Sequence, residues 1–140
     1  MRPACAMLAT CLALAAAGCG EEPTEAARAS DAYNALTAAI RDGDYEEACE
    51  RLTQKTRQDL RKAGKVQQTG ACDKTLERVI ADVGTDEDAL ATVTPSDVRI
   101  DGPTSATVND VRLEKSGGEW QVEGDLDFVR PLLSGRAPQR

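Results

Sequence analysis

The chain has 140 residues, of which 24 are acidic and 17 basic, and its formal net charge at neutral pH is −7. Nucleic acid is a poor partner for so acidic a chain. Binding to phosphates needs clustered Lys and Arg whose positive charge is not cancelled by nearby Asp and Glu. The chain has no His, which removes the commonest general base and most zinc and haem ligand sets. Aromatic residues make up 3% of the chain, so the core must be small and built mainly from Leu, Val, Ile and Ala.

The first 18 residues have the pattern of an export signal. Arg2 precedes an uncharged apolar segment, Ala4 to Ala17, that is too short to cross a bilayer. The segment closes with Leu14-Ala15-Ala16-Ala17-Gly18-Cys19. This ending resembles the lipobox of bacterial lipoproteins, in which the Cys becomes the first mature residue and carries the lipid. We therefore expect removal of residues 1–18 and lipid attachment at Cys19. Cleavage at Ala15-x-Ala17 with plain secretion is the alternative.

Acylation of Cys19 would place two or three hydrocarbon chains in one membrane leaflet, and two chains anchor a protein stably. The mature chain would have 140 − 18 = 122 residues, and its net charge would go from −7 to −8 because only Arg2 is lost. We expect a lipid-anchored protein on the extracytoplasmic face of the cell membrane. Residues 19–29, which are polar and rich in Ala, are the predicted tether.

Two further cysteines remain in the mature chain, since Cys5 and Cys11 belong to the leader. Cys49 and Cys72 form no CxxC motif and have no His or third Cys nearby, which favours a structural bridge over a redox or metal site. An even pair of thiols in an oxidising compartment forms a disulfide by default. We predict a Cys49–Cys72 disulfide, no metal and no other cofactor.

The N-terminal half shows helical periodicity. The first predicted helix runs from Ser30 to Arg41, with Ser30 as its N-cap and Asp42-Gly43 as its end. The second runs from Asp44 to about Thr53 and begins with Asp44 and Glu47, a spacing that resembles a capping box.

A continuous helix from Asp44 to Ala63 is the alternative on propensity alone. It would hold Cys49 about 21 Å from the helix end, and the connection to Cys72 would have to run all the way back. We therefore predict a break between Thr53 and Thr56. Thr56 then caps a short third helix that ends at Ala63-Gly64.

The fourth predicted helix spans residues 72–83 and stops at Gly84, and one more turn is expected over residues 86–91. After Thr94-Pro95 the apolar period changes from 3.6 to two, which is typical of strands. The predicted turns are Asp101-Gly102 and Ser116-Gly117-Gly118, and the phase of the pattern slips at Asn109-Asp110, where we expect a bulge or a strand break. The predicted inward strand residues are Val98, Ile100, Ala106, Val108, Val111, Leu113, Trp120, Val122, Leu126 and Phe128.

Helices followed by antiparallel strands predict an α+β domain, with the helices packed on one face of a small C-terminal sheet. The order of five segments resembles small lipoproteins of actinobacterial type that carry an NTF2-like, cystatin-related domain. These segments are residues 39–49, Cys72 at a helix start, and residues 98–102, 106–108 and 118–122. The resemblance covers roughly residues 30–128 and implies an NTF2-like domain over residues 30–130, with a loose tail over residues 131–140. The strands are short for that fold, which implies a shallow or absent cavity.

Some NTF2-like enzymes use an acid and a Tyr for proton transfer, and Tyr33, Tyr45 and Asp110 are the candidates in this chain. Both tyrosines lie on core-facing stripes, so core packing is the simpler interpretation. The chain also lacks a phosphate-binding loop and a nucleophile motif. We therefore expect no catalytic residues and no enzyme.

The middle of the chain is basic against an acidic background. Its cations could face lipid headgroups or an acidic partner, whereas a solvated face with a Glu47–Arg51 pair is the simpler interpretation. The residues are Arg51, Lys55, Arg57, Arg61, Lys62, Lys65 and Lys74. Asp86-Glu87-Asp88 lacks the ligand spacing of a calcium loop.

Two functions remain open. The first is a non-catalytic interaction or accessory module at the cell envelope, which would bind an envelope protein whose identity the sequence does not indicate. The second is a binding protein for a small apolar ligand in an NTF2-like pocket.

Overall fold

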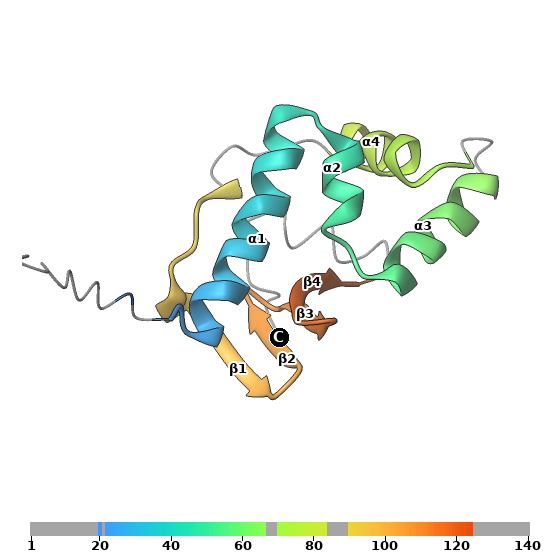
Figure 1. The fold of residues 1–140 in the computed structure, drawn as a ribbon. Coiled ribbons are helices and arrows are strands. Elements are labelled where there is room, and N and C mark those ends of the chain that lie inside the picture. The colour runs from blue at the N-terminus through green and yellow to red at the C-terminus, as the bar shows by residue number, and fades with distance from the viewer. Residues whose placement is uncertain (1–19, 21, 67–69, 84–89, 125–140) are drawn as a thin grey trace, which may run out of the picture.

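The computed structural model describes residues 20, 22–66, 70–83 and 90–124. Its α-helices are α1 (Glu25–Asp42), α2 (Tyr45–Glu50), α3 (Gln54–Val66) and α4 (Cys72–Val83), and a short 3-10 helix, η2 (Pro95–Asp97), follows them. Its strands are β1 (Val98–Gly102), β2 (Ser105–Val108), β3 (Val111–Ser116) and β4 (Glu119–Glu123). Helices come first and strands follow, so the predicted α+β class is confirmed (Figure 1). The predicted leader, Cys19, the Gly84 stop, most of the turn at 86–91, Leu126, Phe128 and the tail lie outside the described residues.

The four strands form one antiparallel sheet in the order β1-β2-β3-β4. Helix α1 packs on one face of this sheet and contacts β1, β2 and β4. The register aligns the apolar side chains on that face, because Ala106 pairs with Leu113, Val108 with Val111, and Leu113 with Val122. All of them are buried, so α1 and the sheet enclose the core between them.

Two tight hairpin turns connect the last three strands. Asn109 and Asp110 both have positive φ angles, 48° and 65°, and Val108 pairs directly with Val111 across them. In such a two-residue turn the flanking residues point to the same face, so the strand break accounts for the predicted phase slip. Gly117 and Gly118, with φ of 60° and 87°, make the same kind of turn between β3 and β4, as predicted.

Strand β1 differs from the prediction in two respects. It extends through Gly102, so the turn to β2 lies at Pro103-Thr104 and not at Asp101-Gly102. Pro103 explains the shift, because its φ suits the first corner of a turn and it has no N–H to donate to a ladder. Ile100 pairs with buried Ala106 but is itself 43% exposed, because it lies on the edge strand of the sheet.

Helix α1 begins five residues earlier than predicted. Thr24 is its N-cap, and the Thr24 hydroxyl accepts a hydrogen bond of 3.1 Å from the Ala27 N–H. Ser30 is not a cap; it is buried inside the helix, and its hydroxyl donates to the Ala27 carbonyl. The Ala-rich start of the helix explains the difference, since Ala is the best helix former. The C-terminal end is as predicted, with Gly43 in the left-handed conformation at φ 75°.

The predicted break between the second and third helices exists, but it lies at residues 51–53 and not between Thr53 and Thr56. Helix α2 starts after Asp44, whose carboxylate accepts from the Glu47 N–H, and it ends at Glu50. Thr53, and not Thr56, is the cap of α3, because the Thr53 hydroxyl accepts from the N–H of Thr56. Helix α3 also continues past the predicted end at residues 63–64 to Val66, and Gly64 is buried within the helix. Helix α4 has the predicted bounds.

The chain between α2 and α3 ties the helices to the sheet. Leu52 forms a parallel bridge to Val122 of β4, with hydrogen bonds of 2.9 Å from Thr53 N–H to the Val122 carbonyl and from Val122 N–H to the Arg51 carbonyl. This segment therefore pairs with the outer edge of β4. The Thr56 hydroxyl adds a contact, because it accepts from the N–H of Gly124 at 3.0 Å.

The other three helices pack in succession beyond α1. Helix α1 contacts α2, α2 contacts α4, and α4 contacts α3. In Figure 1 the chain enters at the N-terminal end of α1 beside β1, whereas α3 extends at the opposite end of the molecule. No helix among the described residues is both long and apolar enough to cross a membrane.

The first turn of α1 is attached to the sheet by the Glu25 clamp, which consists of Glu25, Lys115 and Trp120. The Glu25 carboxylate accepts hydrogen bonds of 2.9 Å from Lys115 Nζ and from Trp120 Nε1. The Lys115 ammonium also lies 5.9 Å from the centre of the Trp120 ring. The hydrogen bond from Lys115, and next the one from Trp120, lower the pKa of Glu25.

Candidate functional site

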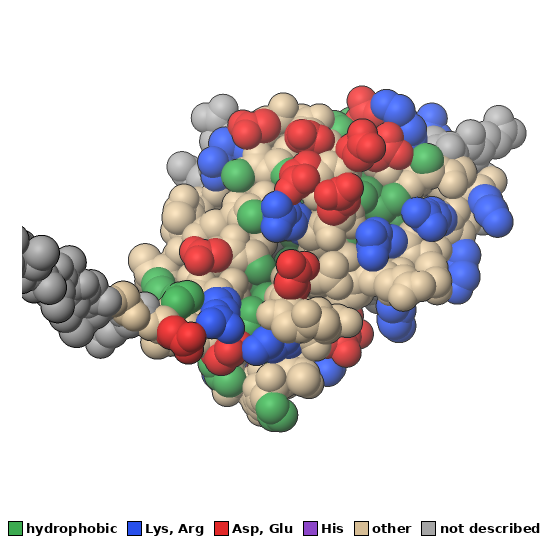
Figure 2. Space-filling view, viewed as in Figure 1, with side chains coloured by type: hydrophobic (Ala, Val, Ile, Leu, Met, Phe, Trp, Pro, Cys, Tyr) green, Lys and Arg blue, Asp and Glu red, His purple; other side chains and the backbone are tan. Residues whose placement is uncertain are grey.

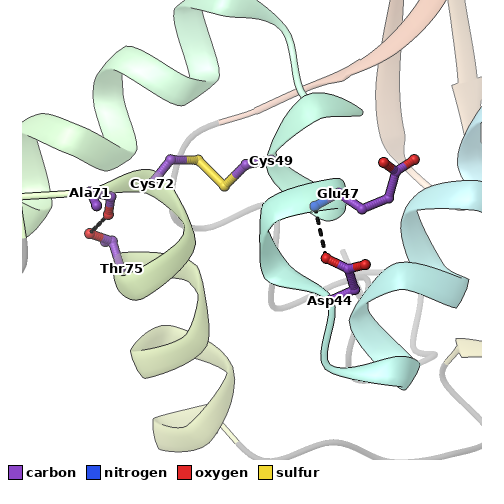
Figure 3. Close-up of a disulfide and its surroundings, with 6 residues drawn as sticks. All are labelled: Asp44, Glu47, Cys49, Ala71, Cys72 and Thr75. Carbon is purple, nitrogen blue, oxygen red and sulfur yellow. Dashed lines mark hydrogen bonds between the residues drawn. A yellow bond between two sulfur atoms is a disulfide. The ribbon is translucent and has the colours of Figure 1, made fainter.

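Cys49 and Cys72 form a disulfide, as predicted, and their Cα atoms are 6.3 Å apart. Figure 3 shows that the bridge joins α2 to the first residue of α4. Both ends are held locally: Asp44 caps α2, and the Thr75 hydroxyl donates to the Ala71 carbonyl at 2.7 Å where α4 begins. Each Cys is only 6% exposed, so the bridge is part of the core.

A groove of about 490 Å³ lies beside this disulfide, between α2, α3 and α4. The disulfide and the residues just before α4 line it, and its other lining residues are charged. Glu46 and Glu50 line it from α2, Arg57 and Arg61 from α3, and Asp73 from the start of α4. The groove therefore has an acidic wall and a basic wall.

The charges are spaced to act in pairs. Glu46 and Glu50 are four residues apart on α2, and Arg57 and Arg61 are four residues apart on α3, so each pair shares one helix face. Within the described part of the chain, none of these four side chains forms a salt bridge. The two walls thus face the groove without neutralising each other.

Other cations of the predicted basic region do have partners. Arg51 pairs with Glu47, as predicted, Lys55 and Lys62 both pair with Asp59, and Lys74 pairs with Glu77. These are exposed pairs within one helix or at its end, which confirms the interpretation as a solvated face for these four residues. Arg57 and Arg61 differ from them because both line the groove.

The three residues considered for proton transfer lie on different elements. Tyr33 is on α1 and only 2% exposed; burial raises the pKa of its hydroxyl, and a hydrogen bond with Asn109 partly offsets this. Tyr45 begins α2 and packs partly buried against the core. Asp110 is exposed in the β2–β3 turn. Tyr33 is thus near the turn that carries Asp110. Core packing accounts for Tyr33, and the geometry of the turn accounts for Asp110.

Sequence reasoning singled out the arginines of the groove but not its carboxylates. The spacing of Glu46 and Glu50 was the available signal, since it matches that of Arg57 and Arg61. The pattern alone does not indicate that α2, joined to α4 by the disulfide, and α3, which packs on α4, line one groove. In the part of the chain that is described, no group of three or more His, Cys, Asp or Glu side chains is placed to hold a metal ion. The acidic run at residues 86–88 lies outside that part.

Comparison of the chain with models of protein families, with curated proteins and with solved structures finds no match.

Proposed function

We propose that the protein is a lipid-anchored lipoprotein on the extracytoplasmic face of the cell membrane, and that its NTF2-like domain is a non-catalytic interaction or accessory module at the envelope. The lipobox-like ending at Cys19 supports the anchor. The observation that carries the proposal is the Cys49–Cys72 disulfide, because structural disulfides persist in exported proteins and are rare in a reducing cytosol.

The packing of the core supports an interaction module over a carrier of a small apolar ligand. An NTF2-like pocket would lie between the helices and the sheet. At that place the side chains of Leu36, Val108 and Leu113 are fully buried among their neighbours. A partner would then meet the protein at its surface, where the described residues form the charged groove.

Metabolic labelling with a fatty-acid analogue in a bacterial host tests the anchor. We expect the wild-type chain to incorporate label and to fractionate with membranes, and Cys19→Ser to lose both properties. Cys11→Ser is the matched control, because it changes a leader Cys that we do not expect to carry lipid. Wild-type protein that is exported without label and remains in the soluble fraction would contradict the proposal and leave ordinary secretion.

A further inference from the structure

The charged groove between α2, α3 and α4 has a composition that restricts what it can bind. Three carboxylates and two guanidinium groups line it, so the groove as a whole is slightly acidic although one wall is basic. A uniformly anionic polymer that approached Arg57 and Arg61 would also meet Glu46 and Glu50 across the groove, and like charges in close contact are costly. An apolar ligand would desolvate charged groups without compensation.

The membrane that would hold the anchor is also a poor occupant. Residues 25–29 of the predicted tether belong to α1, so the chain that would lead to the anchor reaches the domain at Thr24. Helix α3 lies at the opposite end of the molecule (Figure 1). Figure 2 shows Lys and Arg side chains gathered over α3 and acidic side chains over α2. An anionic lipid surface would attract the first group and repel the second, so it does not complement this face.

We infer that the groove binds a polypeptide segment of mixed charge, with acidic side chains against Arg57 and Arg61 and a basic side chain against Glu46 and Glu50. This names the partner chemistry of the interaction module proposed above and rests on that proposal. Arginines suit the role because a guanidinium group binds a carboxylate through two parallel hydrogen bonds. The described fold leaves both arginines without a salt bridge, so a partner does not have to displace one.

Selection from a random heptapeptide library tests this inference, with the full chain purified from the fraction in which it is found. We expect the enriched peptides to carry Asp or Glu together with Lys or Arg. Their binding should weaken as salt increases, because the contacts are partly exposed. Enrichment of no peptide, or of peptides without mixed charge, would overturn the inference.

Three double variants then locate the site on the most enriched peptide. Arg57→Gln/Arg61→Gln should weaken binding about tenfold or more. Lys55→Gln/Lys62→Gln is the matched control: it removes the same charge from the same helix outside the groove, and binding should change less than about threefold. Equal losses in both variants would mean a diffuse charge effect and would refute the groove as the site.

Glu46→Gln/Glu50→Gln separates a mixed-charge partner from an anionic one. Removal of the acidic wall should weaken a mixed-charge peptide, whereas it would strengthen binding of a purely anionic ligand such as polyphosphate, and that second outcome would overturn the inference. All three variants should melt close to wild type, since they change surface residues. The label result at Cys19 is independent: a chain without lipid that still selects mixed-charge peptides refutes the anchor and not the groove.

Discussion

Loss of the Cys49–Cys72 bridge should cost the domain a large part of its stability. The two residues are 23 positions apart, so the bridge closes a loop of 24 residues that contains the whole of α3. For a loop of this length the chain-entropy model gives about 3.5 kcal/mol. A small domain is stable by roughly 5–15 kcal/mol in total, so the loss is substantial. For a domain of about 100 residues we expect a decrease of about 15–25 °C in Tm.

The assay compares melting curves of oxidised wild type, reduced wild type and the Cys49→Ser/Cys72→Ser variant. Reduced wild type keeps the same side chains, so its difference from oxidised wild type measures the cross-link alone. We expect the double variant to melt near or slightly below reduced wild type, because each Cys is buried and Ser packs less well there. A reduced protein that melts within about 5 °C of the oxidised one would refute the loop-closure reasoning. Two alkylatable thiols at these positions in exported protein would refute the bridge.

Two further predictions concern the sheet and its contact with α1. The pKa of Glu25 is lowered from its ordinary value of 4.5, so its contribution to stability is fully present above pH 4.5 and is lost as pH falls from there through the lowered pKa. Glu25→Gln should therefore flatten the acid side of a stability–pH curve. Glu22→Gln is the control; if both variants keep the wild-type slope, the Glu25 clamp is not the cause. Asp110→Gly should raise the free energy of unfolding by about 0.5–1 kcal/mol, because Gly adopts the positive φ of 65° without strain, and Asp110→Val should lower it. Urea titration decides, and a destabilised Gly variant contradicts the turn assignment.

The parts of the fold that were predictable from sequence have local signals. The bounds of α4 follow from its apolar stripe and its neighbouring glycines, and the turn at residues 116–118 follows from two consecutive glycines. The break after α2 is different, because a covalent constraint predicts it and helix propensity does not. The disulfide and the break support each other, since a continuous helix would have carried Cys49 away from Cys72.

The parts that were mispredicted depend on competition between neighbouring signals or on tertiary position. Ser30 has the chemistry of an N-cap, but Thr24 has it as well, and the Ala residues between them make the longer helix favourable. Thr53 and Thr56 present the same choice at the start of α3, and the bridge from Leu52 to β4 favours the earlier one. Ile100 follows the inward alternation of a strand, but the edge position of β1 leaves it exposed.

The geometry of the groove depends on how α2 is held, because a helix of six residues is not stable by itself. Asp44 caps its start, the disulfide holds Cys49 against α4, and the Leu52 bridge attaches the following residues to β4. These contacts lie before, within and after α2, so they determine both its position and its rotation. The acidic wall of the groove is therefore set by the sheet and by α4 together, and a partner would meet carboxylates whose backbone is already positioned.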